Sequence, residues 1–387
     1  MHEKPVSALD RVLPGTGNTP LTSRRLVLIG LLSPLLAACS GATGNGTATI
    51  GSVVATTGTS ASGAAPRAAA ASTSTTTAVD RQPVAVVFPG PGTLIFLPFE
   101  VAQALGFFAG QGLNVGFTYA KGGPPAVTAL LAGSTDFVGT TIDLALNSYK
   151  QHKMITMVTS ITRVPAFAVV TTSATVTSLK DLSGKTVGIT NVGAGDELVL
   201  QYLLKQQGVD PQSVQYAAIG PDEAKINALK ANQVEAAILQ EPALSIVEKQ
   251  GGHVLANLYD PKEAQAAFGG GYQFTGLVTT PAVISGKADL VQRMVNAVVQ
   301  ADRFIAANNG TAITAKLPDN AIVGGDRSAF AKILDQYKQA IFSADGQIHA
   351  DEVDTVAKVQ AASGALTGAK PDMTQFFTNA FVDAAAR

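Results

Sequence analysis

Glycines and hydroxyl side chains recur where predicted strands end, and these residue types suit hydrogen bonding to a small molecule. Hydroxyl groups add donors and acceptors without adding charge, glycines let backbone N–H groups approach a ligand, and helix N-termini attract anions. The sequence therefore predicts a small-molecule site built from loops. Its candidate residues are Thr93, Gly122, Gly123, Thr140, Thr141, Ser160, Thr162, Asn191, Gly193, Ala194 and Gly195.

Each of these loops also has a purely structural interpretation. Gly122-Gly123 would then form only a turn, and Thr140-Thr141 would cap a helix that begins near Asp143. The run Gly193-Ala194-Gly195 is similar to the start of a dinucleotide-binding loop, but Leu198 stands where the third glycine belongs. We therefore expect no nucleotide cofactor there.

Charged side chains close to these loops are equally open to two interpretations. Lys121 and Arg163 would suit an anionic ligand, although solvation at the surface is the commoner fate of such residues. Glu241, followed by Pro242, fits the start of a helix better than contact with a ligand.

The sequence carries none of the common enzyme signatures. The four histidines, His2, His152, His253 and His349, are scattered, and no H-E-x-x-H, G-x-S-x-G or cysteine-ligand spacing occurs. We expect a protein that is not an enzyme, with no catalytic residues, no metal and no cofactor. An enzyme, or a sensor or scaffold with a binding fold, remains as an alternative.

Strand and helix patterns alternate along the chain after residue 82. Apolar runs at 84–88, 115–119, 137–140, 154–160 and 167–172 are each typical of a strand, and helical patterns lie among them. The alternation restarts at 186–190 and continues to a return strand at 274–279. Such a pattern predicts an α/β fold with mostly parallel sheets. Helical patterns at 290–307, 330–342, 353–362 and 374–385 then predict a helical C-terminal region.

The repeat of the pattern predicts two lobes, the second inserted within the first. We assign residues 83–172 and 275–387 to lobe 1 and residues 173–274 to lobe 2. The chain would cross between them near 170–173 and again near 272–275. Open α/β sheets bind ligands beyond the carboxyl ends of their strands, so the site should lie between the lobes.

The N-terminus has the order of a bacterial lipoprotein signal. Arg24-Arg25 precede the apolar stretch from Leu26 to Leu36, and Ala37-Ala38 precede Cys39, the only cysteine. We interpret residues 1–38 as a signal peptide and Cys39 as the lipidated N-terminus. An ordinary thiol beside another cleavage site and a misassigned start are alternatives. The arginine pair fits twin-arginine export as well as the general route.

Residues 39–82 are rich in Ser, Thr, Ala and Gly, and they predict a flexible tether between the lipid anchor and the lobes. The formal net charge of the chain is −1, and no basic run appears, so we expect no binding to nucleic acid. We expect a monomer held to the membrane by its lipid, either on the outer face of the cytoplasmic membrane or in the periplasm.

Several segments resemble the solute-binding proteins of nitrate, sulfonate and taurine importers, a family that also includes binders of the thiamine-precursor pyrimidine. The similar segments lie at 98–115, 129–137, 178–188 and 228–242; in the last, Glu235 replaces the usual aspartate. Their order and spacing carry the resemblance. It implies a two-lobed type II periplasmic-binding-protein fold, hinge closure on a ligand and delivery to ABC permease subunits.

The sequence departs from the pyrimidine binders of this family. Their first loop typically carries Asn or His, whereas residues 90–96 have neither, and the chain has no tryptophan. We therefore favour a small anion such as a sulfonate or nitrate. A heteroaromatic solute remains the alternative, because Phe88, Phe96, Tyr119 and Tyr272 are available to stack a ring.

Overall fold

The structure is a computed structural model, and it describes residues 81–385 apart from residues 91 and 323. The predicted signal peptide, the predicted lipidation at Cys39 and residues 39–80 of the predicted tether lie outside the described residues. The predicted tether ends one residue too late, because the first strand already begins at Gln82.

The first five-stranded sheet has the order β2-β1-β3-β10-β4. Strand β10 runs antiparallel to both of its neighbours, and β1 is parallel to β2 and β3. The strands are β1 (Gln82–Pro89), β2 (Leu113–Ala120), β3 (Phe137–Thr141), β4 (Thr156–Ser160) and β10 (Thr275–Thr279). The helices before β4 are α1 (Leu97–Ala104), α2 (Phe107–Gly110), α3 (Gly123–Leu131) and α4 (Asp143–Tyr149).

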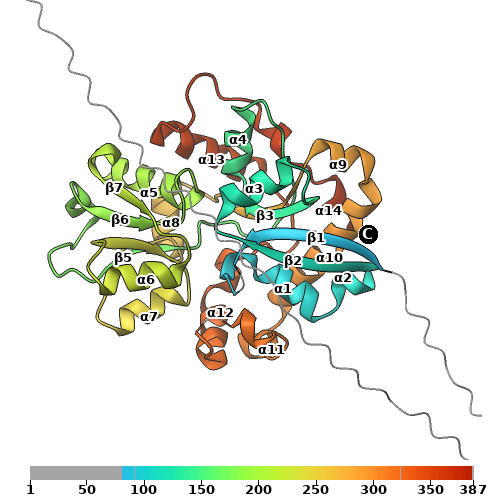
Figure 1. The fold of residues 1–387 in the computed structure, drawn as a ribbon, viewed down its shortest axis with the longest axis horizontal. Helices are drawn as coiled ribbons and strands as arrows, with labels where there is room; N and C mark the ends of the chain where they lie inside the picture. The colour runs from blue at the N-terminus through green and yellow to red at the C-terminus, as the bar shows by residue number, and fades with distance from the viewer. Residues whose placement is uncertain (1–80, 91, 323, 386–387) are drawn as a thin grey trace, which may run out of the picture. The chain divides into compact units, whose positions relative to one another are not determined.

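The second sheet has the order β7-β6-β8-β5-β9, and here β5 is the antiparallel strand. Figure 1 shows it beside the first sheet, with helices around both. The strands are β5 (Ala168–Thr171), β6 (Thr186–Ile189), β7 (Gln215–Ala218), β8 (Ala236–Leu239) and β9 (His253–Asn257). The helices of this lobe are α5 (Gly195–Gln206), α6 (Asp222–Lys230), α7 (Ala243–Lys249) and α8 (Pro261–Phe268).

Helices dominate the chain after β10, as the sequence predicts. They are α9 (Pro281–Gly286), α10 (Ala288–Ala307), α11 (Gly310–Thr314), α12 (Arg327–Ile341), α13 (Ala350–Ser363) and α14 (Ala380–Ala385). The helix expected over 374–385 is broken, because Asn379 accepts a hydrogen bond from Ile348 N and donates one to Ile348 O, at 2.9 and 2.8 Å. These bonds occupy the Asn379 side chain, and Phe377 just before it is extended.

The predicted pair of α/β lobes is confirmed, but the first crossing lies earlier than expected. Because β5 is a strand of the second sheet, the chain passes between the sheets within residues 161–167, not near 170–173. An apolar run says where a strand is but not which sheet it joins. The second crossing lies just before β10.

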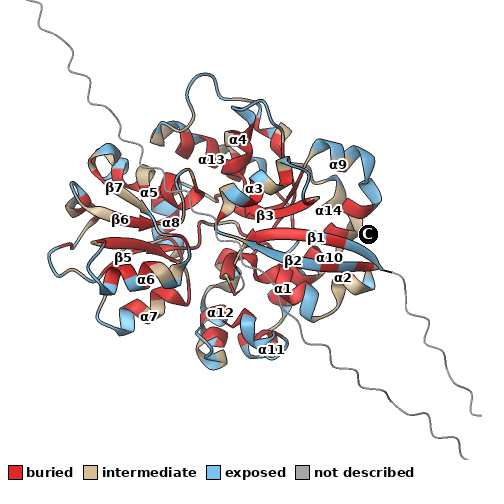
Figure 2. Cartoon of the chain, viewed as in Figure 1, coloured by how far each residue is buried: buried red, intermediate tan, exposed pale blue. Residues whose placement is uncertain are grey.

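Most strands of the two sheets are buried under helices, whereas the edge strands β2, β7 and β9 are partly exposed (Figure 2). Under the first sheet the rings of Phe88, Phe96 and Phe99 pack together with centroids 5.4–6.1 Å apart. Gly139 makes room for them, since a Cβ there would lie 2.5 Å from the Phe99 ring. This packing holds the ends of β1 and β3 in place, where the candidate loops begin.

Gly276 in β10 tests how tightly the return strand is packed. A Cβ there would lie 2.6 Å from Met157 Sδ and would clash with the carbonyl oxygen of Thr159. We expect Gly276→Ala to lower the free energy of unfolding by about 1–3 kcal/mol, the usual cost of overpacking. Chemical denaturation measures it. The matched control is Gly110→Ala, where nothing lies within 4 Å; equal losses in both variants would contradict the expectation.

Candidate ligand-binding site

The two segments that join the lobes are hydrogen-bonded to each other. Backbone bonds join Ile161 N to Thr275 O at 2.9 Å and Phe274 N to Thr162 O at 3.0 Å. The hydroxyls of Thr162 and Thr275 lie 2.6 Å apart, and that of Thr275 also donates to Ile95 O. These bonds hold the two crossings together. They also commit the hydroxyl of Thr162 to a structural hydrogen bond.

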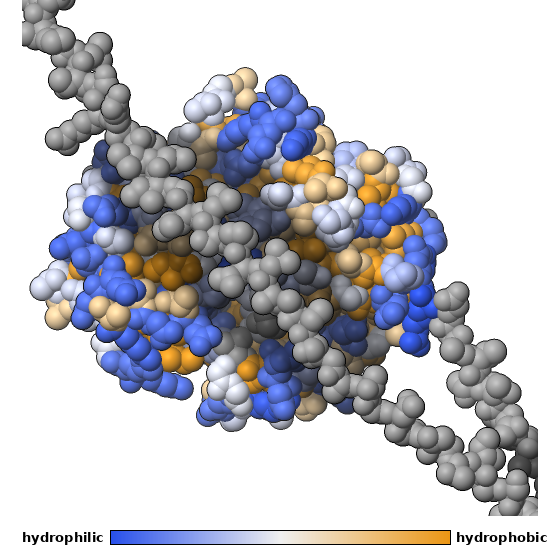
Figure 3. Space-filling view, in the orientation of Figure 1, coloured by the Kyte–Doolittle hydropathy of each residue, from blue (hydrophilic) through white to orange (hydrophobic). Residues whose placement is uncertain are grey.

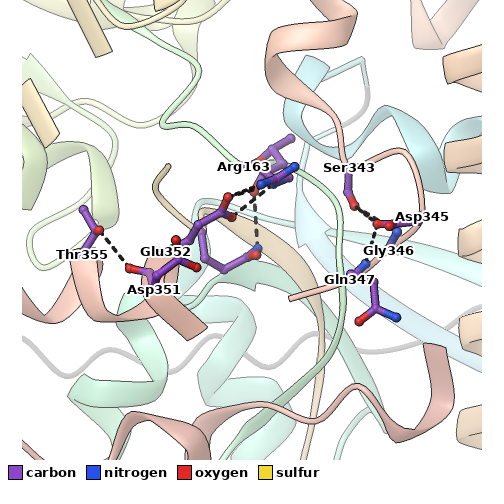
Figure 4. A network of polar contacts seen from close by, with 10 residues as sticks. Arg163, Ser343, Asp345, Gly346, Gln347, Asp351, Glu352 and Thr355 are labelled. Atoms are coloured by element: carbon purple, nitrogen blue, oxygen red, sulfur yellow. Dashed lines mark hydrogen bonds and ion pairs between the residues drawn. The ribbon is translucent and has the colours of Figure 1, made fainter. Parts of the chain in front are cut away.

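Arg163, next along the first crossing, is held by Glu352 at the start of α13. Its Nε donates to the Glu352 carboxylate at 2.9 and 3.2 Å, and its Nη2 pairs with the same group (Figure 4). Glu352 is buried, so this pair is screened less than a surface pair. The ion pair of Arg163 with Glu352 therefore links the first crossing to α13.

A cleft of about 450 Å³ lies between the loops of the two lobes. Lobe 1 contributes the ends of β1 and β2 with the loops that follow them, and lobe 2 contributes the loops before α6 and α7. This is the edge of each sheet where ligands of open α/β folds bind. The lining residues are Pro89, Gly90, Gly92, Thr93, Tyr119, Ala120, Lys121, Gly122, Thr190, Gly220, Pro221, Asp222, Glu223, Gln240, Glu241, Pro242 and Ala243.

Carboxylates outnumber cations on this wall. Asp222, Glu223 and Glu241 line the cleft, and Lys121 is the one basic residue among the lining residues. Lys225 lies behind the wall, where its Nζ pairs with Asp222 at 2.7 Å. Burial raises the pKa of Glu241, whose carboxylate accepts bonds from Ser245 N and Oγ.

Tyr119 presents an aromatic face to the cleft. It is 41% exposed, its ring meets Phe88 edge-on with centroids 5.3 Å apart, and its hydroxyl lies 3.5 Å from Glu100. Hydrophilic side chains cover much of the surface seen in Figure 3. The exposed large hydrophobic residues in the described part of the chain are Tyr119, Tyr149 and Val192. Tyr119 lies near the end of β2 and Val192 in the loop before α5, both at the lobe boundary. Exposed apolar groups at such a place are typical of binding surfaces.

Loops that were predicted to touch ligand touch each other. Asn191 in lobe 2 donates from its side-chain amide to the backbone carbonyl of Lys121 in lobe 1. Gly122 permits this approach, because a Cβ there would clash with the Asn191 amide, and its φ of +112° also favours glycine. The lobes are therefore in contact beside the cleft.

Carboxylates of α5 already occupy backbone amides in the loop before it. Thr190 N donates to Asp196 at 2.9 Å, and Gly193 N donates to Glu197 at 2.5 Å. Both acids lie in the first turn of the helix, where they also favour the helix dipole. The N–H groups that the sequence offers to an anion are thus partly taken by the protein itself.

A carboxyl group with no partner lies between the lobes. Asp143 is 1% exposed, and neither of its oxygens has a hydrogen-bond partner among the described residues. Gly195 of lobe 2 covers it, since a Cβ there would lie 3.0 Å from Oδ1. Burial raises the pKa of Asp143 to about 6, and Asp196 adds to the rise, while the nearby Thr141 hydroxyl opposes it.

The predicted site residues divide into four groups. Thr93 and Gly122 line the cleft. Gly123, Thr140, Thr141 and Gly195 gather around Asp143 or the start of α4, and Asn191, Gly193 and Ala194 form the loop before α5. Thr162 is bonded to Thr275, and Ser160 is buried with an unpartnered hydroxyl away from the lining of the cleft.

Sequence reasoning missed the part of the cleft formed by residues 220–223. Gly220 has a φ of +93°, and Pro221 precedes α6, so a strand end followed by Gly-Pro was an available signal. Among the described residues, no group of three or more His, Cys, Asp or Glu side chains could hold a metal ion. No helix in the same part of the chain is long and apolar enough to cross a membrane.

The family model described as NMT1/THI5 like matches residues 95–312, more than half of the chain. The chain belongs to the NMT1/THI5-like family. It is 22% identical over 286 residues to the putative binding protein YtlA of Bacillus subtilis strain 168, covering 71% of this chain and 81% of YtlA. The predicted resemblance is thereby confirmed.

Solved structures with the same fold come from several bacteria. A protein from Bordetella bronchiseptica RB50 aligns with a TM-score of 0.71 at 23% identity, over 79% of this chain and 97% of its own. The nitrate-binding protein NrtA of Synechocystis PCC 6803 gives 0.65 at 12%, over 79% and 89%. The alkanesulfonate-binding protein SsuA of Xanthomonas axonopodis pv. citri, bound to MOPS, gives 0.62 at 17%, over 78% and 99%.

The likenesses show the periplasmic-binding-protein fold for this member of the family, as predicted. The same architecture also serves catalysis, because the desulfurization enzyme DSZB aligns with a TM-score of 0.55 at 13% identity, over 79% of this chain and 99% of its own. Fold alone therefore does not separate binding from catalysis.

Asp143 should make stability depend on pH. Its pKa is about 6 in the folded chain against an ordinary value of 3.8, so the folded state holds the extra proton and stability is lost as pH rises from about 4 to 6. The difference corresponds to about 3 kcal/mol at most, reached if the lobes stay closed. Denaturation of wild type and Asp143→Asn at about pH 4 and pH 7 should show this loss in wild type only. The same pH dependence of stability in wild type and in Asp143→Asn would contradict this expectation.

Proposed function

We propose that this protein is the extracytoplasmic solute-binding component of an ABC importer, which captures a small molecule between its lobes and presents it to the permease. The observation that carries the proposal is the cleft between the loops of two α/β lobes, with the lobes touching beside it at Gly122 and Asn191. Membership of the family and the likeness to SsuA and NrtA support import over a sensor or scaffold.

Capture would proceed by hinge closure. In the described part of the chain two crossings join the lobes, and both lie at the hydrogen-bonded ladder around Thr162 and Thr275. Rotation there would separate the loops at Lys121 and Asn191 and admit a solute. A ligand that contacts both lobes binds the closed form better and shifts the population toward it.

The lining of the cleft favours an organic solute over a bare oxyanion. Its volume of about 450 Å³ falls within the range of about 300–1,000 Å³ typical of small-molecule sites. Tyr119 offers a stacking face. The acidic residues of the lining, of which Asp222 is paired with Lys225, disfavour a purely anionic ligand. We propose a solute with an apolar or flat part and hydrogen-bond donors, which moves the balance away from the small anion expected from sequence.

An anionic solute is the second candidate, because Lys121 lines the cleft and the similar proteins SsuA and NrtA bind alkanesulfonates and nitrate by name. Catalysis is a weaker candidate that rests on the DSZB likeness. Export, lipidation of Cys39 and anchoring beside the permease belong to the proposal as well, supported by the order of residues 24–39.

Gly122 tests whether closure is needed for binding. We expect Gly122→Ala to weaken binding of any cognate solute about tenfold or more, because its Cβ would clash with Asn191 only when the lobes are closed. Isothermal titration calorimetry measures the affinity. Gly133→Ala is the matched control, with a φ of +73° and nothing within 4 Å, and it should bind normally. Unchanged affinity in Gly122→Ala would contradict the closure mechanism.

The solute class can be tested with matched probes. Nitrate, propane-1-sulfonate, taurine and 4-aminopyrimidine should be titrated against the full chain, with thermal shift as the first readout. We expect a donor-bearing probe to bind best. Tyr119→Leu should weaken binding of the aromatic probe by about threefold to tenfold, the loss of one aromatic contact. If no probe binds and none is retained in native mass spectrometry, the import proposal is in doubt.

A further inference from the structure

The lobe boundary holds a polar cluster that its own structure does not satisfy. Both oxygens of Asp143 and the hydroxyl of Thr140 are buried without a hydrogen-bond partner among the described residues. A buried carboxylate is costly when little replaces its lost hydration, and here the nearby Thr141 hydroxyl and the Asp143 backbone N–H offset that cost only in part. At a boundary where the lobes can separate, opening would relieve this cost, whereas a rigid core offers no such relief.

Asp143 belongs to lobe 1, but groups from both lobes bury it. Gly195 at the start of α5 comes from lobe 2, and Phe274 comes from the second crossing; a Cβ on Gly195 would lie within 3.2 Å of the Phe274 ring. The α13 residue Gln360 donates to the backbone oxygen of Asp143 at 2.9 Å. Separation of the lobes would take Gly195 away and return the carboxyl group to water.

Among the residues that the structure describes, no basic group acts on this carboxylate. The titratable side chains whose charge acts with it are Asp196, on α5, and Tyr272, before β10. From α13 the contact is the neutral amide of Gln360, and Thr141 on β3 supplies a hydroxyl. The surroundings therefore add negative charge or none, so closure over an ionised Asp143 is unfavourable unless a donor arrives with the solute.

We propose that Asp143 opposes closure of the empty cleft and thereby selects solutes that bring a hydrogen-bond donor, such as an ammonium or N–H group, to the boundary between the lobes. This inference rests on the proposed function. Gly195 is part of the arrangement, since any larger residue would press on the carboxyl group. Asp143 would determine which solutes bind by changing the equilibrium between the open and closed forms.

Closure can be measured without knowing the solute. Dyes on Gln103→Cys in α1 and Asn227→Cys in α6, both exposed positions, would report the separation of the lobes in the full chain with Cys39→Ser. From about pH 7.5 to about pH 5 the closed fraction of solute-free wild type should rise about threefold or more, because protonation removes the buried charge. Asp143→Asn should be closed at both values.

Asp302→Asn is the matched control. Asp302 is also buried with two unpartnered oxygens, but it lies on α10 in lobe 1, away from the boundary, so this variant should close as wild type does. The same separation at both pH values in wild type, or the wild-type response retained in Asp143→Asn, would overturn the inference. If Asp143→Asn does not fold, the wild-type response compared with Asp302→Asn decides the matter.

Selection is tested with two probes that differ at one group. Taurine carries an ammonium where propane-1-sulfonate carries a methyl group, and wild type should bind taurine about tenfold more tightly, a preference that Asp143→Asn should lose. Equal binding of the two would overturn the selection. If none of the four probes binds and no solute is retained in native mass spectrometry while closure still follows pH, the proposed import function fails and the role of Asp143 in closure stands. If solutes bind while closure ignores pH, only the inference fails.

Discussion

The arrangement of this protein depends on one short ladder of hydrogen bonds, where residues 161–162 lie beside residues 274–275. Each crossing ends in the antiparallel strand of the next sheet, β5 after the first and β10 after the second. The two sheets therefore repeat the same strand order with an inserted strand in the same place. Because both connections pass through the ladder, a hinge motion of the lobes would rotate about it.

Acidic side chains near the cleft accept hydrogen bonds from the protein's own backbone amides. Asp196 and Glu197 accept from the loop before α5, Asp222 accepts from Gln240 N, and Glu241 accepts from Ser245. Each acid stabilises a loop that borders the cleft, and each reduces what that loop can offer an anion. The same contacts that shape the site therefore set its preference, which explains how a fold shared with sulfonate and nitrate binders can have an acidic wall.

Sequence patterns predicted the architecture well because they are local. The alternation of strands and helices, the return strand before α9 and the amphipathic α10 all follow from periodicity within one segment. The lobe that β5 joins does not, since the pairing of β5 with β8 and β9 is decided by tertiary contacts. The break before α14 was missed for the same reason, because the Asn379 side chain bonds to Ile348, in a distant segment.

The site shows the same division between position and chemistry. Glycines and hydroxyls at strand ends lie in loops near the lobe boundary, because strand ends on one sheet edge are neighbours. What those loops can bind depends on which backbone amides already have a partner. The sequence does not reveal that the amide of Gly193 donates to Glu197. Asp143 is the sharpest case: from the sequence it only marks the start of a helix, and the approach of Gly195 from the other lobe helps to bury its charge. Its influence on function exists only while the lobes are closed, so it belongs to the assembled structure and to no segment of the chain.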